Sequence, residues 1–327
     1  MTDAEAPVPP SRPDLAPAAR AVLDDCLRVR PGEELLVVTD PGTRSIGEVL
    51  VAGGRARGAE AVLVEIAERE SNGTEPPPSV AAAMASCDVL IAPTTKSLSH
   101  TEARRAANAA GARAATMPGI TEEMMARTMA ADFSALRPRS REVARLLTEG
   151  SEVRITSAAG TDLTLGIEGR TGLSDDGDLS SSGAFGNLPP GEAFLAPVEG
   201  TTNGRLVIDG TMWPVGRLAE PLVFEVSGGY VRAMTGRHAD EVRAAVERHG
   251  PEAFAIAELG IGTNDAAQLT GNVLEDEKIL GTIHVAIGDN HTFGGTIRVS
   301  SHQDGIVLDP TLSIDGHTIL DAGKLLV

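Results

Sequence analysis

Aromatic residues are scarce in this chain of 327 amino acids, in which six Phe, one Trp and one Tyr account for 2% of the residues. Proteins that bind single-stranded nucleic acids usually stack the bases on aromatic side chains. Basic residues are also few: 28 Lys and Arg stand against 46 Asp and Glu, and the net charge of −18 repels phosphate backbones and anionic membranes. We therefore expect neither a nucleic-acid partner nor a membrane partner.

Cysteines and long apolar runs are equally limited. Cys26 and Cys87 lie in separate segments without a CxxC motif, so the sequence predicts neither a disulfide scaffold nor a cysteine zinc site. Residues 1–17 contain Asp3 and Glu5 and lack the apolar region of a signal peptide. No stretch approaches the roughly 18 apolar residues of a membrane span. These features predict a cytoplasmic protein with reduced thiols.

The length and the 42% apolar content predict two domains, at residues 1–149 and 150–327. Charge divides unevenly near this boundary, because residues 1–150 carry 17 basic and 21 acidic side chains and the remainder carries 11 and 25. Most histidines also fall in the second part, at His238, His249, His284, His291, His302 and His317. Carboxylates and imidazoles form many metal sites, although solvated surface acids account for most such excesses.

In the first domain, apolar strand-like runs alternate with helix-like segments. Strands are predicted at 33–40, 59–66 and 87–93, and helices at 15–30, 43–57 and the Ala- and Arg-rich stretch 101–114. This alternation is typical of right-handed βαβ units and predicts a Rossmann-like parallel sheet with helices. Because Gly53, Gly54 and Gly58 do not form a GxGxxG motif, nucleotide binding would rest on the architecture alone.

Beyond a linking helix predicted at 138–149, the pattern changes to that of a β-rich α+β domain. Apolar and polar residues alternate on both sides of Ala159-Gly160, which is a hairpin signature. Further strands are predicted at 205–209, 222–226, 254–259, 282–287, 296–299 and 306–314, with one helix at 238–249. The predicted fold class is therefore α/β in two domains.

Two histidines stand in alternating patterns. If 296–304 is a strand, His302 and Asp304 project to the same face and form one corner of a metal site, although an exposed His-x-Asp pair is the commoner outcome. In 282–288, bulky residues alternate with His284 and small residues, so His284 faces away from the core beside open volume. A core histidine bonded to a carbonyl is the alternative.

Three glutamates extend this inventory. Glu258 ends an apolar run, where burial of an unpaired charge is unfavourable unless a cation or proton neutralises it, although the Gly-rich turn that follows can lift it to solvent. Glu192 follows the rigid Pro189-Pro190 turn, and surface placement is the simpler interpretation. Glu277 lies in an acidic run that is either solvated surface or a source of a proton acceptor or a histidine-orienting partner.

Together Glu192, Glu258, His284, His302 and Asp304 supply three carboxylates and two imidazoles in one domain. This inventory suits two divalent ions that share a carboxylate, roughly 3.5–4 Å apart, and generate a hydroxide for hydrolysis. Oxygen donors combined with imidazole favour Zn, Co, Mn or Fe(II) over Cu(I).

Four segments carry a family resemblance: NLPPGEAFLAP (187–197), AELGIGTN (257–264), TIHVAIGDN (282–290) and SHQDG (301–305). They resemble the motifs of the thermophilic metallo-aminopeptidases of the aminopeptidase T and aminopeptidase S type, also labelled leucyl aminopeptidases. The resemblance implies that the five residues named above bind two divalent ions. It further implies an enzyme that removes N-terminal residues from small peptides and forms a homodimer.

One catalytic position departs from that family. The family's catalytic Tyr, seven residues after the histidine of the third motif, is His291 here, and the spacing between His284 and His302 is shorter. The resemblance implies that a metal-bound hydroxide attacks the peptide carbonyl while Glu277 handles the proton. His291 would then donate a hydrogen bond to the oxyanion in place of the Tyr.

These departures leave two alternatives open. The superfamily that the chain resembles also includes iron(II) dioxygenases that cleave dihydroxypyridine rings, and His284, His302 and Asp304 would suit the facial ligand set of one Fe(II). A non-catalytic relative that binds peptides or small molecules is the other. Retention of both Glu192 and Glu258 favours a two-metal aminopeptidase, and this is the function we expect from the sequence.

Overall fold

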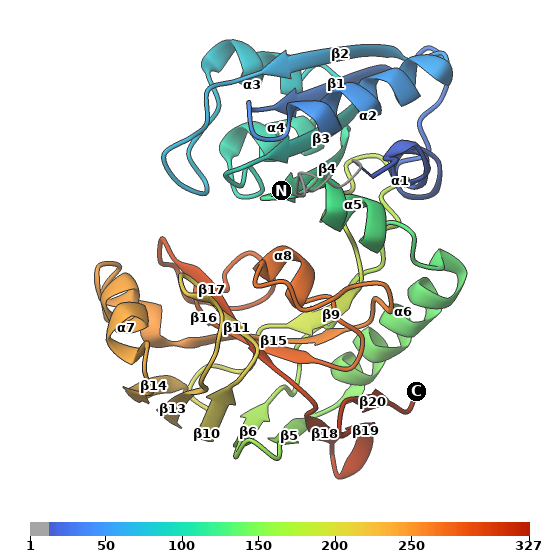
Figure 1. Cartoon of the computed structure of the whole chain (residues 1–327). Helices are drawn as coiled ribbons and strands as arrows, with labels where there is room; N and C mark the ends of the chain where they lie inside the picture. Colours follow the sequence, from blue (N-terminus) through green and yellow to red (C-terminus); the bar gives the residue numbers. More distant parts are fainter. Residues whose placement is uncertain (1–12) are drawn as a thin grey trace, which may run out of the picture.

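The computed structural model describes residues 13–327, which fold into two α/β domains built on three sheets (Figure 1). In this range the sheets have five, eight and seven strands, here named sheets A, B and C. The predicted fold class is confirmed. No helix within residues 13–327 is long and apolar enough to cross a membrane. The cytoplasmic location and the homodimer stay predictions.

Sheet A is the parallel sheet of the first domain. Its strands are β2 (Glu60–Glu65), β1 (Glu34–Thr39), β3 (Val89–Thr94), β4 (Arg113–Pro118) and β8 (Phe185–Asn187), in that order. The predictions at 33–40, 59–66 and 87–93 are confirmed by β1, β2 and β3. Strand β8 comes from beyond residue 150 and pairs in parallel with β4, so the chain returns to the first domain before it enters sheet C.

Helices cover both faces of sheet A. One face packs against α1 (Ala16–Arg20), the π-helical turn η1 (Ala21–Cys26), α2 (Arg44–Ala56) and α5 (Glu122–Thr128), and the other packs against α3 (Pro78–Met84) and α4 (Glu102–Ala109). The predicted helix 15–30 ends early, because the chain turns at Arg28 with a φ of 48°. The helix predicted over the Ala- and Arg-rich stretch 101–114 is also shorter than expected. It ends at Ala109, and the last residues of the stretch already belong to β4.

Helix α6 (Phe133–Glu149) leads from the first domain into the second. It begins five residues before the predicted start at Pro138 because the Asp132 side chain accepts a hydrogen bond from the Ser134 N–H and caps the helix there. Its buried face, which includes Val143 and Leu147, packs against the core of the second domain.

Sheet B is antiparallel and starts with the predicted hairpin. Its strands are, in order, β14 (Tyr230–Thr235), β13 (Leu222–Ser227), β10 (Asn203–Ile208), β6 (Asp162–Gly166), β5 (Glu152–Thr156), β18 (Thr311–Ile314), β19 (His317–Asp321) and β20 (Lys324–Leu325). Strands β5 and β6 pair around the turn at 157–161, which confirms the hairpin. Helix α7 (Ala239–Glu247) confirms the predicted helix at 238–249.

Sheet C carries the predicted metal-site residues. Its strands are, in order, β12 (Gly216–Arg217), β11 (Thr211–Met212), β17 (His302–Val307), β16 (Ile283–Gly288), β15 (Ile256–Gly262), β9 (Glu192–Leu195) and β7 (Leu173–Asp175). A 3-10 turn, η2 (Pro251–Phe254), precedes β15, and the short helix α8 (Val273–Asp276) lies between β15 and β16. The apolar core of the domain lies between sheets B and C and draws residues from both.

One predicted strand is wrong. Residues 296–299 are not a strand, because their backbone N–H groups donate to side chains instead of a neighbouring strand: Ile297 to Asn290 Oδ1 and Val299 to Asp289 Oδ2. The predicted run 306–314 is likewise interrupted between β17 and β18. The strand that carries the His-x-Asp motif therefore starts at His302.

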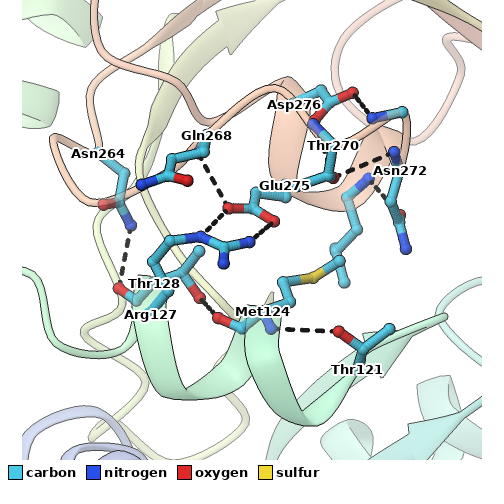
Figure 2. Close-up of polar contacts among 12 residues, drawn as sticks. Thr121, Met124, Arg127, Thr128, Asn264, Gln268, Thr270, Asn272, Glu275 and Asp276 are labelled. Atoms are coloured by element: carbon cyan, nitrogen blue, oxygen red, sulfur yellow. Dashed lines mark hydrogen bonds and ion pairs between the residues drawn. The ribbon is translucent and has the colours of Figure 1, made fainter. Parts of the chain in front are cut away.

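The two domains are joined by polar contacts around α5 and α8, which lie between sheet A and sheet C (Figure 1). Figure 2 shows these contacts. Arg127 on α5 pairs with Glu275 on α8 through two hydrogen bonds of 2.8 and 2.6 Å. The buried side chain of Asn264 donates to the carbonyl of Thr128 at 3.3 Å. These contacts fix the segment that carries α8 against the first domain.

Candidate metal centre

Four neighbouring strands of sheet C present the candidate ligands on one face. Because side chains alternate along a strand, Glu192 of β9, Glu258 of β15, and His284 of β16 lie on the same side as His302 and Asp304 of β17. The alternate residues face the core between the sheets; they are Ala193, Leu195, Leu259, Ile261, Ile283, Val285, Ile287 and Val307. The predicted division of 282–288 into a core face and a histidine face is confirmed.

Glycines clear the space that the histidine occupies. Gly260 lies opposite His284 in the sheet, and a Cβ atom at Gly260 would stand 2.0 Å from His284 Nε2. Ala286 and Gly288 follow on the same face of β16. The small residues noted in the sequence therefore leave room for the imidazole of His284, which is fully buried.

Glu258 lies between the two histidines. Its Oε1 is 3.3 Å from His284 Nε2, and its Oε2 is 3.2 Å from His302 Nε2. Burial raises the pKa of the Glu258 carboxyl, but the hydrogen bonds and charges of the two histidines outweigh it and lower the pKa to about 2. Glu258 is buried rather than lifted to solvent by the turn that follows it.

The histidines carry the complementary effect. Burial lowers the pKa of His284, but the hydrogen bond to Glu258 and the charge of Glu192 outweigh burial. The net effect raises the pKa of His284 to about 9. The pKa of His302 is also raised well above its usual value, because Asp304 and Glu258 outweigh burial. His302 Nε2 is 3.5 Å from Asp304 Oδ1, and its Nδ1 is 2.8 Å from the carbonyl oxygen of Asp289. In the absence of a metal ion, protons on these rings provide the positive charge between the carboxylates.

Glu192 reaches the site through a restricted turn. Strand β8 leads into Leu188 and a cis peptide bond to Pro189, and Gly191 then adopts a φ of 132°. A Cβ atom at Gly191 would stand 2.4 Å from the Cβ atom of Asn264, so a side chain is excluded there. The turn directs Glu192 inward, where its Oε2 lies 3.2 Å from His284 Nε2, and surface placement is wrong.

Glu277 and Lys278 follow α8 and enter the same site. Lys278 Nζ lies 2.9 Å from Glu277 Oε1 and 3.6 Å from Asp175 Oδ2, and it also forms an ion pair with Glu192. Burial raises the pKa of Glu277 to about 8 and that of Asp175 to about 7, although Lys278 opposes the shift in both. The acidic run before β16 is therefore not a solvated surface at Glu277.

Two groups of side chains have ligand atoms within 4.8 Å of one another: Glu192, Glu277 and His284, and Glu258, His284 and Asp304. Glu192 Oε2 and His284 Nδ1 are buried and have no hydrogen-bond partner within the described part of the chain. Carboxylates and imidazole with an unsatisfied oxygen fit a divalent cation such as Fe(II), Mn(II) or Zn(II). The structure brings the five predicted ligands together; that they bind metal stays a prediction.

His291 lies next to this cluster but outside both groups. Its Nδ1 is 2.8 Å from the Asp289 carboxylate, and the backbone carbonyl of Asp289 contacts His302. His291 is therefore connected to His302 through Asp289 rather than by direct contact with the candidate ligands.

Two residues of the site, and one residue coupled to it electrostatically, were not predicted from the sequence. Lys278 and Asp175 belong to the carboxylate half, and the charge of Lys278 within an acidic run was the signal that could have indicated an internal ion pair. His100 comes from the loop after β3 in the first domain. Desolvation by neighbouring protein atoms and the charge of His302 lower the pKa of His100 to about 4, although the residue is exposed to solvent. No local motif marks His100.

Two of the chain's few aromatic side chains also lie at the site. The Phe293 ring stands edge-on to the His302 imidazole, with centroids 5.8 Å apart, and edge-on to Phe194 at 5.7 Å. Both phenylalanines are partly exposed. They form an apolar wall beside a candidate ligand.

Comparison with known proteins identifies the family. A family model described as NicX, 2,5-dihydroxypyridine 5,6-dioxygenase, matches residues 14–327. The chain belongs to this family. A curated 2,5-dihydroxypyridine 5,6-dioxygenase of Pseudomonas putida KT2440 is 22% identical over 222 residues, which are 62% of this chain and 61% of that protein. The match to this relative thus spans less than two thirds of its length.

Solved structures share the fold. The structure of 2,5-dihydroxypyridine dioxygenase from Pseudomonas putida KT2440 superimposes with a TM-score of 0.84 at 19% identity, covering 98% of this chain and 99% of that one. Wild-type AmpT from Thermus thermophilus superimposes with a TM-score of 0.71 at 16% identity, covering 96% and 99%. The resemblance to aminopeptidase T is therefore confirmed for the fold but not for the peptidase family.

These findings correct the function expected from the sequence. The family match and the curated relative point to a dioxygenase, so the prediction of a peptide hydrolase is wrong and the alternative is the better one. The five ligand residues misled because imidazole and carboxylate donors suit a hydrolytic metal centre as well as an iron centre. The roles of Glu277 and His291 were given for peptide hydrolysis and therefore no longer apply. A dioxygenase of this family implies a bound metal, and the site has the donors for one.

Proposed function

We propose that this protein is an Fe(II)-dependent dioxygenase that opens the ring of 2,5-dihydroxypyridine, or a close analogue, between ring atoms 5 and 6. The match of the family model over residues 14–327 carries this proposal. It is supported by a site of imidazole and carboxylate donors, which is a ligand set of non-heme iron oxygenases.

The donors for Fe(II) are Glu258, His284, His302 and Asp304. Glu258, His284 and Asp304 form one of the compact groups, and His302 stands 3.2 Å from Glu258. When bound, Fe(II) would supply the electron transfer that lets dioxygen react with the ring. Glu258 orients both imidazoles by accepting their N–H groups while the site is free of metal.

The substrate ring is expected to lie against the apolar wall of Phe194 and Phe293. Aromatic rings prefer offset or edge-on contacts, and the two phenylalanines already adopt such a contact with each other and with His302. A planar hydroxylated heteroaromatic matches this wall better than an extended peptide does. The wall therefore supports a ring substrate.

His100 is the candidate proton acceptor from the first domain. A pKa of about 4 leaves its imidazole neutral at pH 7, so it can accept a proton from a substrate hydroxyl. The charge of His302 contributes to this shift, which supports a position of His100 near the candidate ligands. His100 would act without being a metal ligand.

An oxygen electrode tests the proposal. Protein reconstituted with Fe(II) under argon is mixed with 2,5-dihydroxypyridine in air-saturated buffer, and the same protein is assayed with an aminoacyl amide. We expect oxygen consumption that requires Fe(II) and substrate together, with no release of amino acid. Amino acid release without oxygen uptake would restore the hydrolase, and an absence of turnover on either substrate would favour a binding protein.

A further inference from the structure

Phe293, one of the two wall residues, is carried by the loop 289–301 between β16 and β17. This loop lies beyond the paired ends of the two strands, so its backbone groups need partners other than a neighbouring strand. One partner is Glu199, whose Oε1 accepts the Thr296 N–H at 2.7 Å. The same oxygen accepts a hydrogen bond from the side-chain amide of Asn290 at 3.3 Å. Glu199 therefore holds the loop on both sides of Phe293.

Arg170 acts together with Glu199, and the two residues are here called the clamp. Arg170 forms an ion pair with Glu199 Oε2, and its Nη1 donates to the carbonyl oxygen of Gly294, the residue after Phe293. The two side chains are only 14% and 25% exposed, so these charge-assisted bonds are partly shielded from water. Burial opposes ionisation of Glu199, but backbone donors and the charge of Arg170 outweigh it and lower the pKa of the carboxyl. The clamp is therefore ionised at neutral pH.

Both clamp residues lie on the same part of the second domain. Arg170 follows the end of β6. The loop that holds Glu199 is tied to that end, because the Val198 N–H donates to the Gly166 carbonyl at 2.8 Å. Glu199 also follows β9, the strand that carries Phe194. The clamp therefore connects the two sides of the aromatic wall.

The tip of the loop depends on this support. Gly294 and Gly295 follow Phe293, and Gly294 adopts a φ of 103°. Glycine loses more conformational freedom than any other residue when the chain becomes ordered, so this tip is costly to hold in one conformation. Gly295 packs so closely against Asn290 that a Cβ atom there would stand 2.0 Å from the Asn290 Cγ. Without the clamp, the segment after Phe293 would gain the freedom of two glycines.

We propose that the clamp of Arg170 and Glu199 positions Phe293 for binding of the substrate ring. It holds the Phe293 ring edge-on to His302 and to Phe194, with centroids 5.8 and 5.7 Å apart. Arg170 and Glu199 are positioning residues, because they act on the substrate through Phe293. This inference rests on the proposed function and names residues that set its substrate affinity.

Steady-state kinetics of Glu199→Ala test this role. Loss of the carboxylate releases the loop, and we expect KM for 2,5-dihydroxypyridine to rise roughly two- to tenfold, the range for a lost aromatic contact. The value of kcat and the Fe(II) content should stay within about twofold, because the candidate ligands keep their places. Arg170→Met should raise KM similarly, and Arg170→Lys, which keeps the charge, should restore part of the loss. The control is Glu225→Ala, which removes an exposed ion pair with Arg205 and should leave KM unaltered.

A double-mutant cycle shows whether the clamp acts through the ring. Phe293→Leu removes the ring itself, so Glu199→Ala should add little to it. We expect KM of the double variant to lie within about twofold of KM of Phe293→Leu. Multiplication of the two single effects would mean that the clamp acts independently of Phe293 and would overturn the inference.

Hydrogen exchange tests the loop without any substrate. We expect peptides from 289–301 to exchange at least about tenfold faster in Glu199→Ala than in the wild type, and at the wild-type rate in Glu225→Ala. Circular dichroism checks the fold, and if Glu199→Ala does not fold, Arg170→Met is measured in the same way. Unchanged exchange in a folded clamp variant would overturn the inference.

The outcomes separate this inference from the proposed function. Faster exchange in Glu199→Ala with unaltered KM, beside Fe(II)-dependent oxygen uptake, would overturn the role of the clamp in substrate binding and leave the dioxygenase standing. An absence of oxygen uptake by the wild type on any dihydroxypyridine would overturn the dioxygenase and with it the substrate role. The exchange rates would then still decide whether Arg170 and Glu199 hold the loop.

Discussion

Arg127 of the first domain and Glu275 of the second form a bidentate ion pair, with N–O distances of 2.8 and 2.6 Å. Glu275 is fully buried and also accepts the backbone N–H of Gln268 (Figure 2). Glu275 lies two residues before Glu277 and three before Lys278. The contact between the domains therefore also fixes the start of the segment that enters the candidate metal site.

Loss of this pair should destabilise the protein. Arg127→Met leaves the Glu275 carboxylate buried without its cation, and we expect a loss of about 3 kcal/mol of unfolding free energy, at the low end of the ~3–5 kcal/mol for broken buried pairs because Arg127 is partly exposed. Urea denaturation measures it. The matched control is Arg205→Met, which removes an exposed pair with Glu225 and should cost less than about 1 kcal/mol. Equal losses in both variants would contradict the account.

Gly260 offers a test of the site that removes no ligand. A Cβ atom at this position would stand 2.0 Å from His284 Nε2, so Gly260→Ala must displace the imidazole. We expect metal affinity to fall by at least about tenfold, comparable to the loss of a residue that orients a ligand. Titration calorimetry with Mn(II) measures the affinity, and circular dichroism checks that the fold persists. Unchanged affinity in a folded variant would mean that His284 is not a ligand.

Metal affinity should rise with pH. In the metal-free protein the pKa of His284 is raised to about 9 and that of His302 is raised well above its usual value, so both rings are protonated at pH 7. A metal ion must replace those protons, and each proton released makes the affinity increase about tenfold per pH unit below the relevant pKa. Calorimetry in buffers of different ionisation enthalpy counts the protons. An affinity that is flat between pH 6 and pH 8 would be inconsistent with imidazole ligands.

Phe293 should affect substrate binding more than metal binding. Phe293→Leu keeps an apolar side chain but removes the ring, and loss of an aromatic contact of about 0.5–1.5 kcal/mol corresponds to a KM increase of roughly two- to tenfold. Metal content should be unchanged. The control is Phe254→Leu, because Phe254 is partly buried and packs against the apolar core of the second domain. This variant should leave KM unaltered. A Phe293→Leu enzyme with normal KM would remove the wall from the substrate site.

Periodicity and local motifs predicted much of the fold. The apolar runs at β1, β2 and β3 are buried on one or both faces of a parallel sheet. Their apolar composition alone therefore predicts strands at these positions. The alternation around His284 likewise predicted which face points to the core, because a strand that borders a core must alternate.

Other features depend on contacts between distant residues. Residues 296–299 look like a strand, but their N–H groups are taken by Asn290 and Asp289. The sequence placed Glu192 on the surface, but its turn is directed inward by the packing of Gly191 against Asn264. Asn264 is far away in the sequence, so the local pattern could not reveal this packing. Such contacts leave no local pattern.

The choice between hydrolase and dioxygenase likewise could not be made from local sequence patterns. Glu192, Glu258, His284, His302 and Asp304 are compatible with either chemistry, and a further residue of the cluster, Lys278, was not among the predicted ones. Its position among three carboxylates becomes visible only when α8, β7 and β9 are placed together. A list of candidate ligands therefore does not by itself determine the reaction.

The most direct test of the central claim is a reaction of the Fe(II)-loaded protein with 2,5-dihydroxypyridine under ¹⁸O₂, followed by mass spectrometry of the product. The account predicts a ring-opened product that carries both atoms of the labelled dioxygen. A product that takes its oxygen from water, or a substrate recovered intact, would contradict it.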